Sequence, residues 1–392
     1  MSTIDQLATP CEAMHHALRR AYRKARADGG TRHRDIAAQL GVSEGELIAA
    51  HVHESGDECW DEPRDEPITP QGLNARRLRK NWPSLIAGLE RVGEVMALTR
   101  NASCVHEKAG VYRNSSASGP AGREMGLVLG EIDLRVFYSR WAHGFDVNET
   151  TAKGVQRSLQ FFDATGTAVH KVFVKAATDT DAWDTLVAAH LADERSPGMD
   201  VASTQPTPTE QPDASIDLPA FHQAWASMRD THEFFGLLRQ HGLSRTQALR
   251  LAEPRFAHPV DAASAQQVLS GAAASGTPVM VFVGNPGMIQ IHTGAVRKVV
   301  VLGPWLNVMD PGFNLHLRED HIAQAWVVRK PTSDGLVTSL ELFDAQGETI
   351  AMVFGERKPG RAELCAWREL IDGLLGDHAS QATAPGVLSC AH

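Results

Sequence analysis

One histidine stands out among the residues that could carry chemistry, because it lies in an apolar segment with helical periodicity. His232 occurs in the run DTHEFFGLLR, beside Phe234, Phe235 and Leu238, which could wall an apolar pocket. A neutral imidazole is the commonest metal ligand in proteins. The same pattern also describes a histidine that packs, partly buried, on one side of an amphipathic helix. The residues alone leave both interpretations open.

Other residue combinations give weaker signals. The spacing of His51, His53 and Cys59 matches no standard zinc site, and acidic neighbours indicate a solvated loop. The segment 31–52 has the rhythm of a helix-turn-helix, but its second helix is acidic and phosphate would repel it, so a plain helical hairpin is favoured. The sequence contains no Walker loop, no GxGxxG and no GxSxG motif, and nucleotide-driven or serine-hydrolase chemistry is unsupported.

Composition narrows the class of protein. The chain has 392 residues, 43% of them hydrophobic, and a formal net charge of −9. This balance argues against general nucleic-acid binding, which depends on Lys and Arg at phosphates. The N-terminal residues lack the apolar core of a secretory signal, and no apolar run is long enough to span a membrane. We therefore predict a cytoplasmic protein without membrane insertion.

The elements that must position His232 belong to an internal duplication. The segment 95–111 aligns with 279–295, so that Asn101 matches Asn285 and Gly110 matches Gly294. Further along, SLQFFDATG (158–166) aligns with SLELFDAQG (339–347). Each copy then reaches a helix with a tryptophan. The offset stays nearly constant, which indicates a tandem repeat of about 185 residues, too long for a solenoid.

Each copy places helical periodicity before a series of short strands separated by Gly-, Asn- and Asp-containing turns. Strands that follow one another without intervening helices form antiparallel sheets. We predict an α+β fold in which each half is a large antiparallel β-sheet flanked by helices. The predicted boundaries are an N-terminal repeat at 1–193, a flexible linker at 194–219, a C-terminal repeat at 220–378 and a disordered tail at 379–392.

Several longer motifs resemble one family. The segments VMALTRNASCVHEKAGVY, IDLRVFYSRWAHGF, WLNVMDPGFNLHL, RKPTSDGLVTSLELFD and FGERKPG look like the haemin-degrading or haemin-transport proteins (HemS/HmuS type) of bacterial haem-uptake operons. The similarity covers nearly the whole chain apart from the linker and both ends. It implies a duplicated α+β fold that holds one haem (iron protoporphyrin IX) between the halves, and a role in iron acquisition.

The resemblance also assigns roles to individual residues. His232 is the proximal iron ligand, and Arg100 is the distal arginine on the opposite face of the haem. Arg245, Lys330 and Arg357 fall on the basic positions beside the propionates, whose carboxylates suit Arg and Lys. Family members have Gln and Tyr where this chain has Met352 and Phe354, so these two positions would supply packing. Arg329, His316, Gln290 and His292 are interpreted as structural.

Two functions share this set of residues. In the first, the protein is an enzyme that degrades haem oxidatively and releases iron, with His232 and Arg100 at the iron and electrons from an external donor. In the second, it is a chaperone that passes intact haem to a separate haem oxygenase. A haem importer, an oxygenase and an electron donor are the expected partners. A third class, a transcriptional regulator, depends only on the helix-turn-helix pattern.

Overall fold

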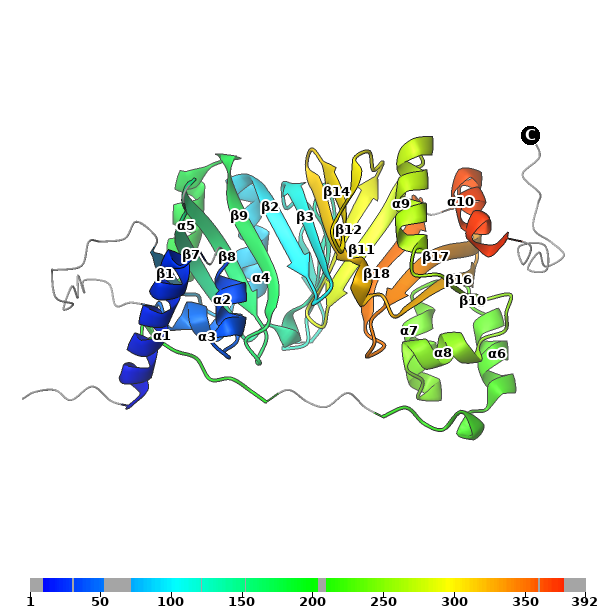
Figure 1. Ribbon diagram of the computed structural model, residues 1–392, viewed down its shortest axis with the longest axis horizontal. Helices are drawn as coiled ribbons and strands as arrows, with labels where there is room; N and C mark the ends of the chain where they lie inside the picture. Colours follow the sequence, from blue (N-terminus) through cyan, green and yellow to red (C-terminus); the bar gives the residue numbers. More distant parts are fainter. Residues whose placement is uncertain are drawn as a thin grey trace, which may run out of the picture. The chain divides into compact units, whose positions relative to one another are not determined.

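The computed structural model describes residues 10–29, 32–52, 72–120, 122–151, 153–203, 209–358 and 360–376. The chain forms two compact units (Figure 1), and each contains short segments from the other half of the sequence. The first unit contains residues 1–99, 109–205 and 285–288, and the second contains 100–108, 206–284 and 289–392. The predicted tail 379–392 lies outside the described residues.

The first unit contains an antiparallel sheet in the order β1-β7-β8-β9-β2. Its strands are β1 (Leu73–Arg77), β2 (Gly93–Arg100), β7 (His143–Thr151), β8 (Gly154–Phe162) and β9 (Ala168–Thr178). Three short strands, β4 (Ser116–Ser118), β5 (Met125–Val128) and β6 (Asp133–Phe137), pair in sequence order. The helices are α1 (Pro10–Ala27), α2 (His33–Gln39), α3 (Glu44–Ala49), α4 (Trp82–Gly88) and α5 (Thr180–His190), with 3-10 turns at Leu89–Val92 and Tyr138–Arg140.

The second unit repeats this plan with the order β10-β16-β17-β18-β11. Its strands are β10 (Ala257–Val260), β11 (Val279–Asn285), β12 (Met288–Gly294), β16 (Gln324–Thr332), β17 (Gly335–Phe343) and β18 (Thr349–Gly355). A second group pairs in the order β3 (Cys104–Gly110), β15 (Phe313–Arg318), β14 (Trp305–Asp310) and β13 (Val299–Leu302). The helices are α6 (Leu218–Ala226), α7 (Glu233–His241), α8 (Arg245–Leu251), α9 (Ser264–Ser275) and α10 (Cys365–Leu375), with 3-10 turns at Asp213–Ser215 and Glu319–His321.

The duplication predicted from the sequence extends to small irregularities. The register shifts between Phe161 and Phe162 in β8, and between Leu342 and Phe343 in β17. Each unit also places a helix, a left-handed glycine and a capping serine in the same order: Gly41 and Ser43 before α3, Gly242 and Ser244 before α8. Glycine adopts the positive φ without a steric penalty, and the serine oxygen accepts a hydrogen bond from the first helical turn. The predicted fold class is confirmed.

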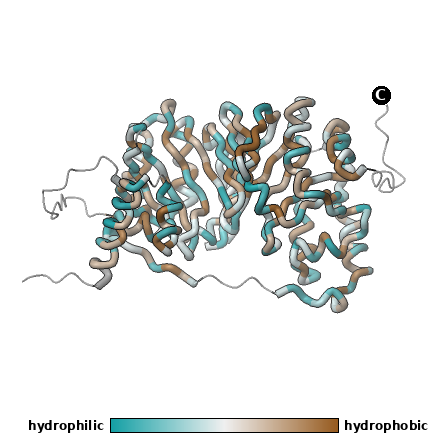
Figure 2. The backbone as a smooth tube through the Cα atoms, viewed as in Figure 1, coloured by the Kyte–Doolittle hydropathy of each residue, from teal (hydrophilic) through white to brown (hydrophobic). Residues whose placement is uncertain are grey.

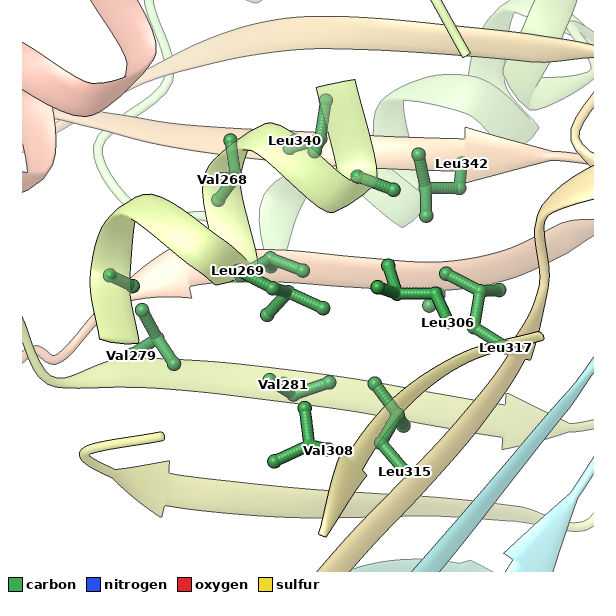
Figure 3. Packing of buried hydrophobic residues seen from close by; sticks show 14 of the residues in the cluster. Val268, Leu269, Val279, Val281, Leu306, Val308, Leu315, Leu317, Leu340 and Leu342 are labelled. Atoms are coloured by element: carbon green, nitrogen blue, oxygen red, sulfur yellow. The ribbon is translucent and has the colours of Figure 1, made fainter. Parts of the chain in front are cut away.

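The sheet of the second unit is covered on both faces. On one face, Val268 and Leu269 of α9 pack with strand residues such as Val281, Leu340 and Leu342 (Figure 3). On the other face, α6, α7 and α8 form a separate core around Trp225. Figure 2 shows hydrophobic and hydrophilic stretches along the backbone, and β17 is buried without a break from Val337 to Phe343, as expected for a strand covered on both faces.

The segment predicted as a flexible linker makes specific contacts at both ends. Gly198 donates its backbone N–H to the carbonyl of Ala49, and Gln247 donates to Asp213 and to the carbonyl of Gln211. Residues 204–208 lie outside the described part of the chain. Among the described residues, no helix is long and apolar enough to cross a membrane.

Candidate functional site

His232 occupies a turn at the start of α7. The helical periodicity of the sequence predicted that His232 lies on a helix, but α6 ends at Ala226 and His232 is the N-cap of α7. Its side chain is 89% exposed. The short polar turn interrupts the helix because Asp230 accepts hydrogen bonds from the His232 backbone N–H (2.8 Å) and pairs with Nδ1 (2.6 Å). The imidazole is therefore exposed to solvent and pairs with Asp230 through Nδ1.

Asp230 was not identified from the sequence. Its hydrogen bonds from the His232 backbone and imidazole lower the pKa of the Asp230 carboxyl, and the charge of Arg357 contributes in the same direction. A carboxylate that holds Nδ1–H of a histidine leaves Nε2 as the free electron-pair donor, which is the usual arrangement behind a metal-ligating imidazole. The spacing Asp-x-His in a turn was the available sequence signal.

Two residues beyond His232, the ring of Phe234 makes cation–π contacts with two basic side chains. The guanidinium carbon of Arg245 lies 5.1 Å from the ring centroid, and Nζ of Lys330 lies 4.7 Å from it. Phe234 and Lys330 are buried, whereas the side chain of Arg245 is 24% exposed. This ring links the helix that presents His232 to two of the basic residues predicted to contact propionates.

Glu341 holds the same two cations from the sheet side. Arg245 donates from Nε and Nη2 to the two carboxylate oxygens (2.7 and 2.8 Å), and Lys330 donates to Oε1 (2.6 Å). The cations and a hydrogen bond from each hold the pKa of the fully buried Glu341 well below its usual range, against the effect of burial. Burial lowers the pKa of Lys330 to about 8, although Glu341 opposes the shift. The three residues are called the Glu341 cluster below.

A partly exposed apolar surface adjoins this cluster on the same sheet face. Met352 pairs with Glu341 across strands, Phe282 pairs with Met352, and Met280 pairs with Phe354, and directly paired residues share a face. The rings of Phe282 and Phe354 meet edge to face at 5.0 Å. Met352 Sδ lies 3.3 Å from Nη2 of Arg245. We call these residues, Met280, Phe282, Met352 and Phe354, the apolar platform.

Arg357 and Arg100, the remaining predicted site residues, follow or end strands outside the Glu341 cluster. Arg357 follows β18 and is half-buried, close enough to Asp230 to affect its titration. Arg100 is the last residue of β2, also half-buried, and its Nε donates to the carbonyl of Asn101. Asn101 in turn donates to the carbonyls of Gly284 and Ile350, which ties the Arg100 segment to the ends of β11 and β18.

The residues interpreted as structural are engaged within the second unit. Arg329 pairs with Asp372, His316 with Asn307, and Gln290 with His106, while His292 stacks on Phe313 at 3.7 Å. Burial lowers the pKa of His292 to about 4.

The two patterns rejected from the sequence do not gain support. The segment 31–52 forms the hairpin α2–α3, and Glu46 completes a capping box with Ser43 in its second helix. His51 is buried and pairs with the carbonyl of Leu47, whereas His53 and Cys59 lie outside the described residues. Within the described ranges, no group of three His, Cys, Asp or Glu residues is placed to hold a metal ion.

The first unit has a counterpart of the Glu341 cluster with inverted charges. The strand registers match Gln160 to Glu341, Glu149 to Lys330 and Lys171 to Met352, and Glu44 follows its capping serine as Arg245 does. Lys171 contacts Glu44 at 2.5 Å, and His33 bridges Glu44 and Glu149 at 2.9 and 3.2 Å. The side chains of His33, Glu44, Glu149 and Lys171 are buried. Arg26, which pairs with Glu149 at 3.2 Å, is buried as well, whereas Arg245 is 24% exposed.

Comparisons with known proteins agree with the duplicated fold. The family described as "Haemin-degrading HemS.ChuX domain" matches twice, over residues 68–190 and 242–374. The chain is 39% identical to hemin transport protein HmuS of Yersinia pestis, covering 92% of this chain and 98% of that protein. It is also 39% identical to hemin transport protein HemS of Yersinia enterocolitica, with 91% and 97% covered.

Solved structures show the same similarity in three dimensions. Holo-PhuS, a haem-binding protein from Pseudomonas aeruginosa, superposes with a TM-score of 0.84 at 44% identity, covering 92% of this chain and 99% of that one. ChuS, described as a haem-degrading enzyme of Escherichia coli O157:H7, superposes with a TM-score of 0.80 at 37% identity, again covering 92% and 99%.

Proposed function

Because the chain belongs to the haemin-degrading HemS/ChuX domain family, we propose that it binds one haem through His232 in a cytoplasmic haem-utilisation system and degrades it oxidatively to release iron. One observation carries the proposal: the exposed imidazole of His232 begins the helix whose Phe234 carries Arg245 and Lys330. Haem requires an axial donor, an apolar surface and cations for its two carboxylates.

The residues present fit each of these needs. His232 supplies the donor, with Asp230 holding Nδ1 so that Nε2 is left as the electron-pair donor. The apolar platform and the exposed Phe235 (71%) supply flat hydrophobic area. Arg245, Lys330 and Arg357 supply positive charge. Arg100 is proposed to donate hydrogen bonds on the side of the haem opposite His232.

When bound, the haem supplies the oxidative chemistry, and an external donor supplies the electrons. The side chains of this protein would ligate the iron, orient the haem and neutralise the charge of its carboxylates. Asp230 fixes the tautomer of His232, the apolar platform excludes water from one side, and the cations hold the carboxylates. These roles follow from the donors and charges of the named side chains.

A second candidate function is transfer of intact haem to a separate oxygenase. The exposure of His232 favours it, because a ligand that reaches solvent can be replaced by the ligand of an acceptor protein. Both functions use the same residues, and they differ in what happens to the porphyrin after binding.

The experiment is a spectral titration of the purified protein with haemin, repeated with His232→Ala. A 1:1 Soret shift that this variant weakens or alters supports the binding proposal, and the absence of saturable binding overturns it. Ascorbate is then added in air with catalase present. Loss of the Soret band with stoichiometric iron release supports degradation, whereas survival of the haem and its movement to an added acceptor supports transfer.

A further inference from the structure

In the Glu341 cluster, a carboxylate of the protein pairs with two of the cations proposed to hold the ligand's carboxylates. Glu341 is 0% exposed, lies near the C-terminal end of β17, and accepts hydrogen bonds from Arg245, Lys330 and Ser339. A buried carboxylate with this many charge-assisted donors is a strong partner for both cations.

The fold does not require a carboxylate at this position. In the first unit the matching residue is Gln160, which donates to Ser158 (3.1 Å). The cations of the second unit are replaced there by Glu44 and Glu149. The same framework therefore accepts the opposite arrangement of charge. The Glu341 cluster, with two cations and one anion, is a property of the second unit rather than of the shared sheet.

The geometry makes Glu341 a competitor of any anionic ligand. Arg245 directs both nitrogens of its bidentate edge, Nε and Nη2, at Glu341, although its side chain is 24% exposed and can be approached from solvent. Lys330 is 4% exposed and also points at Glu341. Arg245 and Lys330 keep further N–H groups that a ligand carboxylate can use, but the charge of Glu341 offsets part of their positive charge. The ligand therefore meets a weaker attraction than the two cations alone would give.

Resting on the proposed haem-binding function, we propose that Glu341 is a positioning residue that competes with the ligand's carboxylates for Arg245 and Lys330 and thereby speeds the departure of the porphyrin. In the unliganded protein Glu341 keeps the two cations paired and in place. When a dianionic porphyrin is bound, Glu341 limits how tightly its carboxylates are held. Glu341 should therefore speed the dissociation of intact haem and of an open-chain product alike, because both keep the two carboxylates.

The test measures the rate at which haemin leaves the protein for excess apomyoglobin, and compares it with haemin dimethyl ester, whose carboxylates carry no charge. Glu341→Gln keeps the size of the side chain and removes its charge. We expect this variant to release haemin about tenfold more slowly, the change that one additional charge-assisted hydrogen bond would give, and to release the diester at the unchanged rate. Added salt should reduce the difference.

Two results would overturn the inference: haemin released at the original rate or faster, or haemin and diester affected alike. The latter is what a general loosening of the fold would produce. The unaltered protein separates this inference from the proposed function. If it fails to bind haemin saturably, the function is wrong; if it binds haemin and only the Glu341→Gln ratio stays unchanged, the competition is wrong.

A second pair of variants guards against misfolding, since Glu341→Gln leaves buried Lys330 without its carboxylate. Lys330→Gln is compared with Lys330→Gln/Glu341→Gln, so that only Arg245, which reaches solvent, remains charged in the double variant. The double variant should release haemin more slowly than the single one, with no change for the diester, and equal rates would contradict the proposal. Glu44→Gln, which removes the buried carboxylate of the matching position in the first unit, should leave the haemin-to-diester ratio unaltered.

Discussion

Nζ of Lys330 lies 2.6 Å from Oε1 of Glu341, and neither side chain is appreciably exposed to solvent. An ion pair at this depth is costly to form, because both charges lose their hydration, and costly to break, because one charge is then left alone. The pair therefore links the titration of this cluster to the stability of the second unit.

Stability should rise with pH between about 8 and 10.5 through Lys330. The pKa of Lys330 in the folded protein is about 8, below the ordinary value of 10.5, so the unfolded chain binds the proton more tightly in this interval. The contribution has a slope of at most about 1.4 kcal/mol per pH unit. Urea unfolding at several pH values, compared with Lys330→Met, checks it. If the difference in the free energy of unfolding between the two proteins does not change between pH 8 and 10.5, the prediction is wrong.

Glu44→Gln should destabilise the first unit without weakening haemin binding. Burial raises the pKa of this carboxyl, but Lys171 and His33 together lower it more, so its contribution is present above its unfolded pKa and lost as the pH falls. Removing the carboxylate takes from buried Lys171 the anionic partner that lies 2.5 Å from its Nζ, at a cost of about 3 kcal/mol. Denaturant unfolding and haemin titration of the same sample test both halves. Weakened haemin binding by a folded variant would count against the assignment of the site to the second unit.

His232→Ala should leave stability almost unchanged while altering the haemin spectrum. The side chain is 89% exposed and pairs only locally, with Asp230, among its described contacts, so the expected cost is within about 0.5 kcal/mol. His16→Ala, at an exposed position on α1, is the matched control and should bind haemin normally. Equal spectra for the two variants would show that His232 is not the iron ligand.

Asp230→Asn should weaken haemin binding by roughly tenfold or more, the usual effect of losing a carboxylate behind a ligating histidine. The amide can still accept one hydrogen bond, so the turn before α7 should persist. Haemin affinity and the position of the Soret band are the measurements. Unchanged affinity would show that the hydrogen bond from Nδ1 of His232 to Asp230 does not contribute to haemin binding.

Trp225→Ala should unfold or severely destabilise the helical layer that presents His232. Trp225 is 1% exposed, stacks on Phe256, meets Phe234 edge to face at 4.7 Å and donates Nε1–H to the carbonyl of Arg329. The expected loss is about 3–5 kcal/mol. Thermal unfolding checks it, with Trp326→Ala, at a partly exposed position on β16, as the milder comparison.

The sequence by itself determined the duplication and the fold class, because both follow from local patterns. The repeated FDA turn and its following glycine recur at matched positions, and strand periodicity is readable over a few residues. His232 was predicted to lie on a helix, whereas it is the N-cap before α7, because Asp230 accepts a hydrogen bond from its backbone N–H and forms a turn there. A short turn within an otherwise periodic segment leaves little trace in periodicity.

Only the tertiary structure decided the partners of the cations. Arg245, Lys330 and Glu341 come from α8, β16 and β17, and nothing in their spacing along the chain indicates that one buried carboxylate holds both cations. The pairing of Glu44 with Lys171 in the first unit could not be predicted for the same reason, because these residues are far apart in the sequence. Charge pairing depends on distance and burial in three dimensions, which strand register and helix placement set, whereas a sequence records only which charges are available.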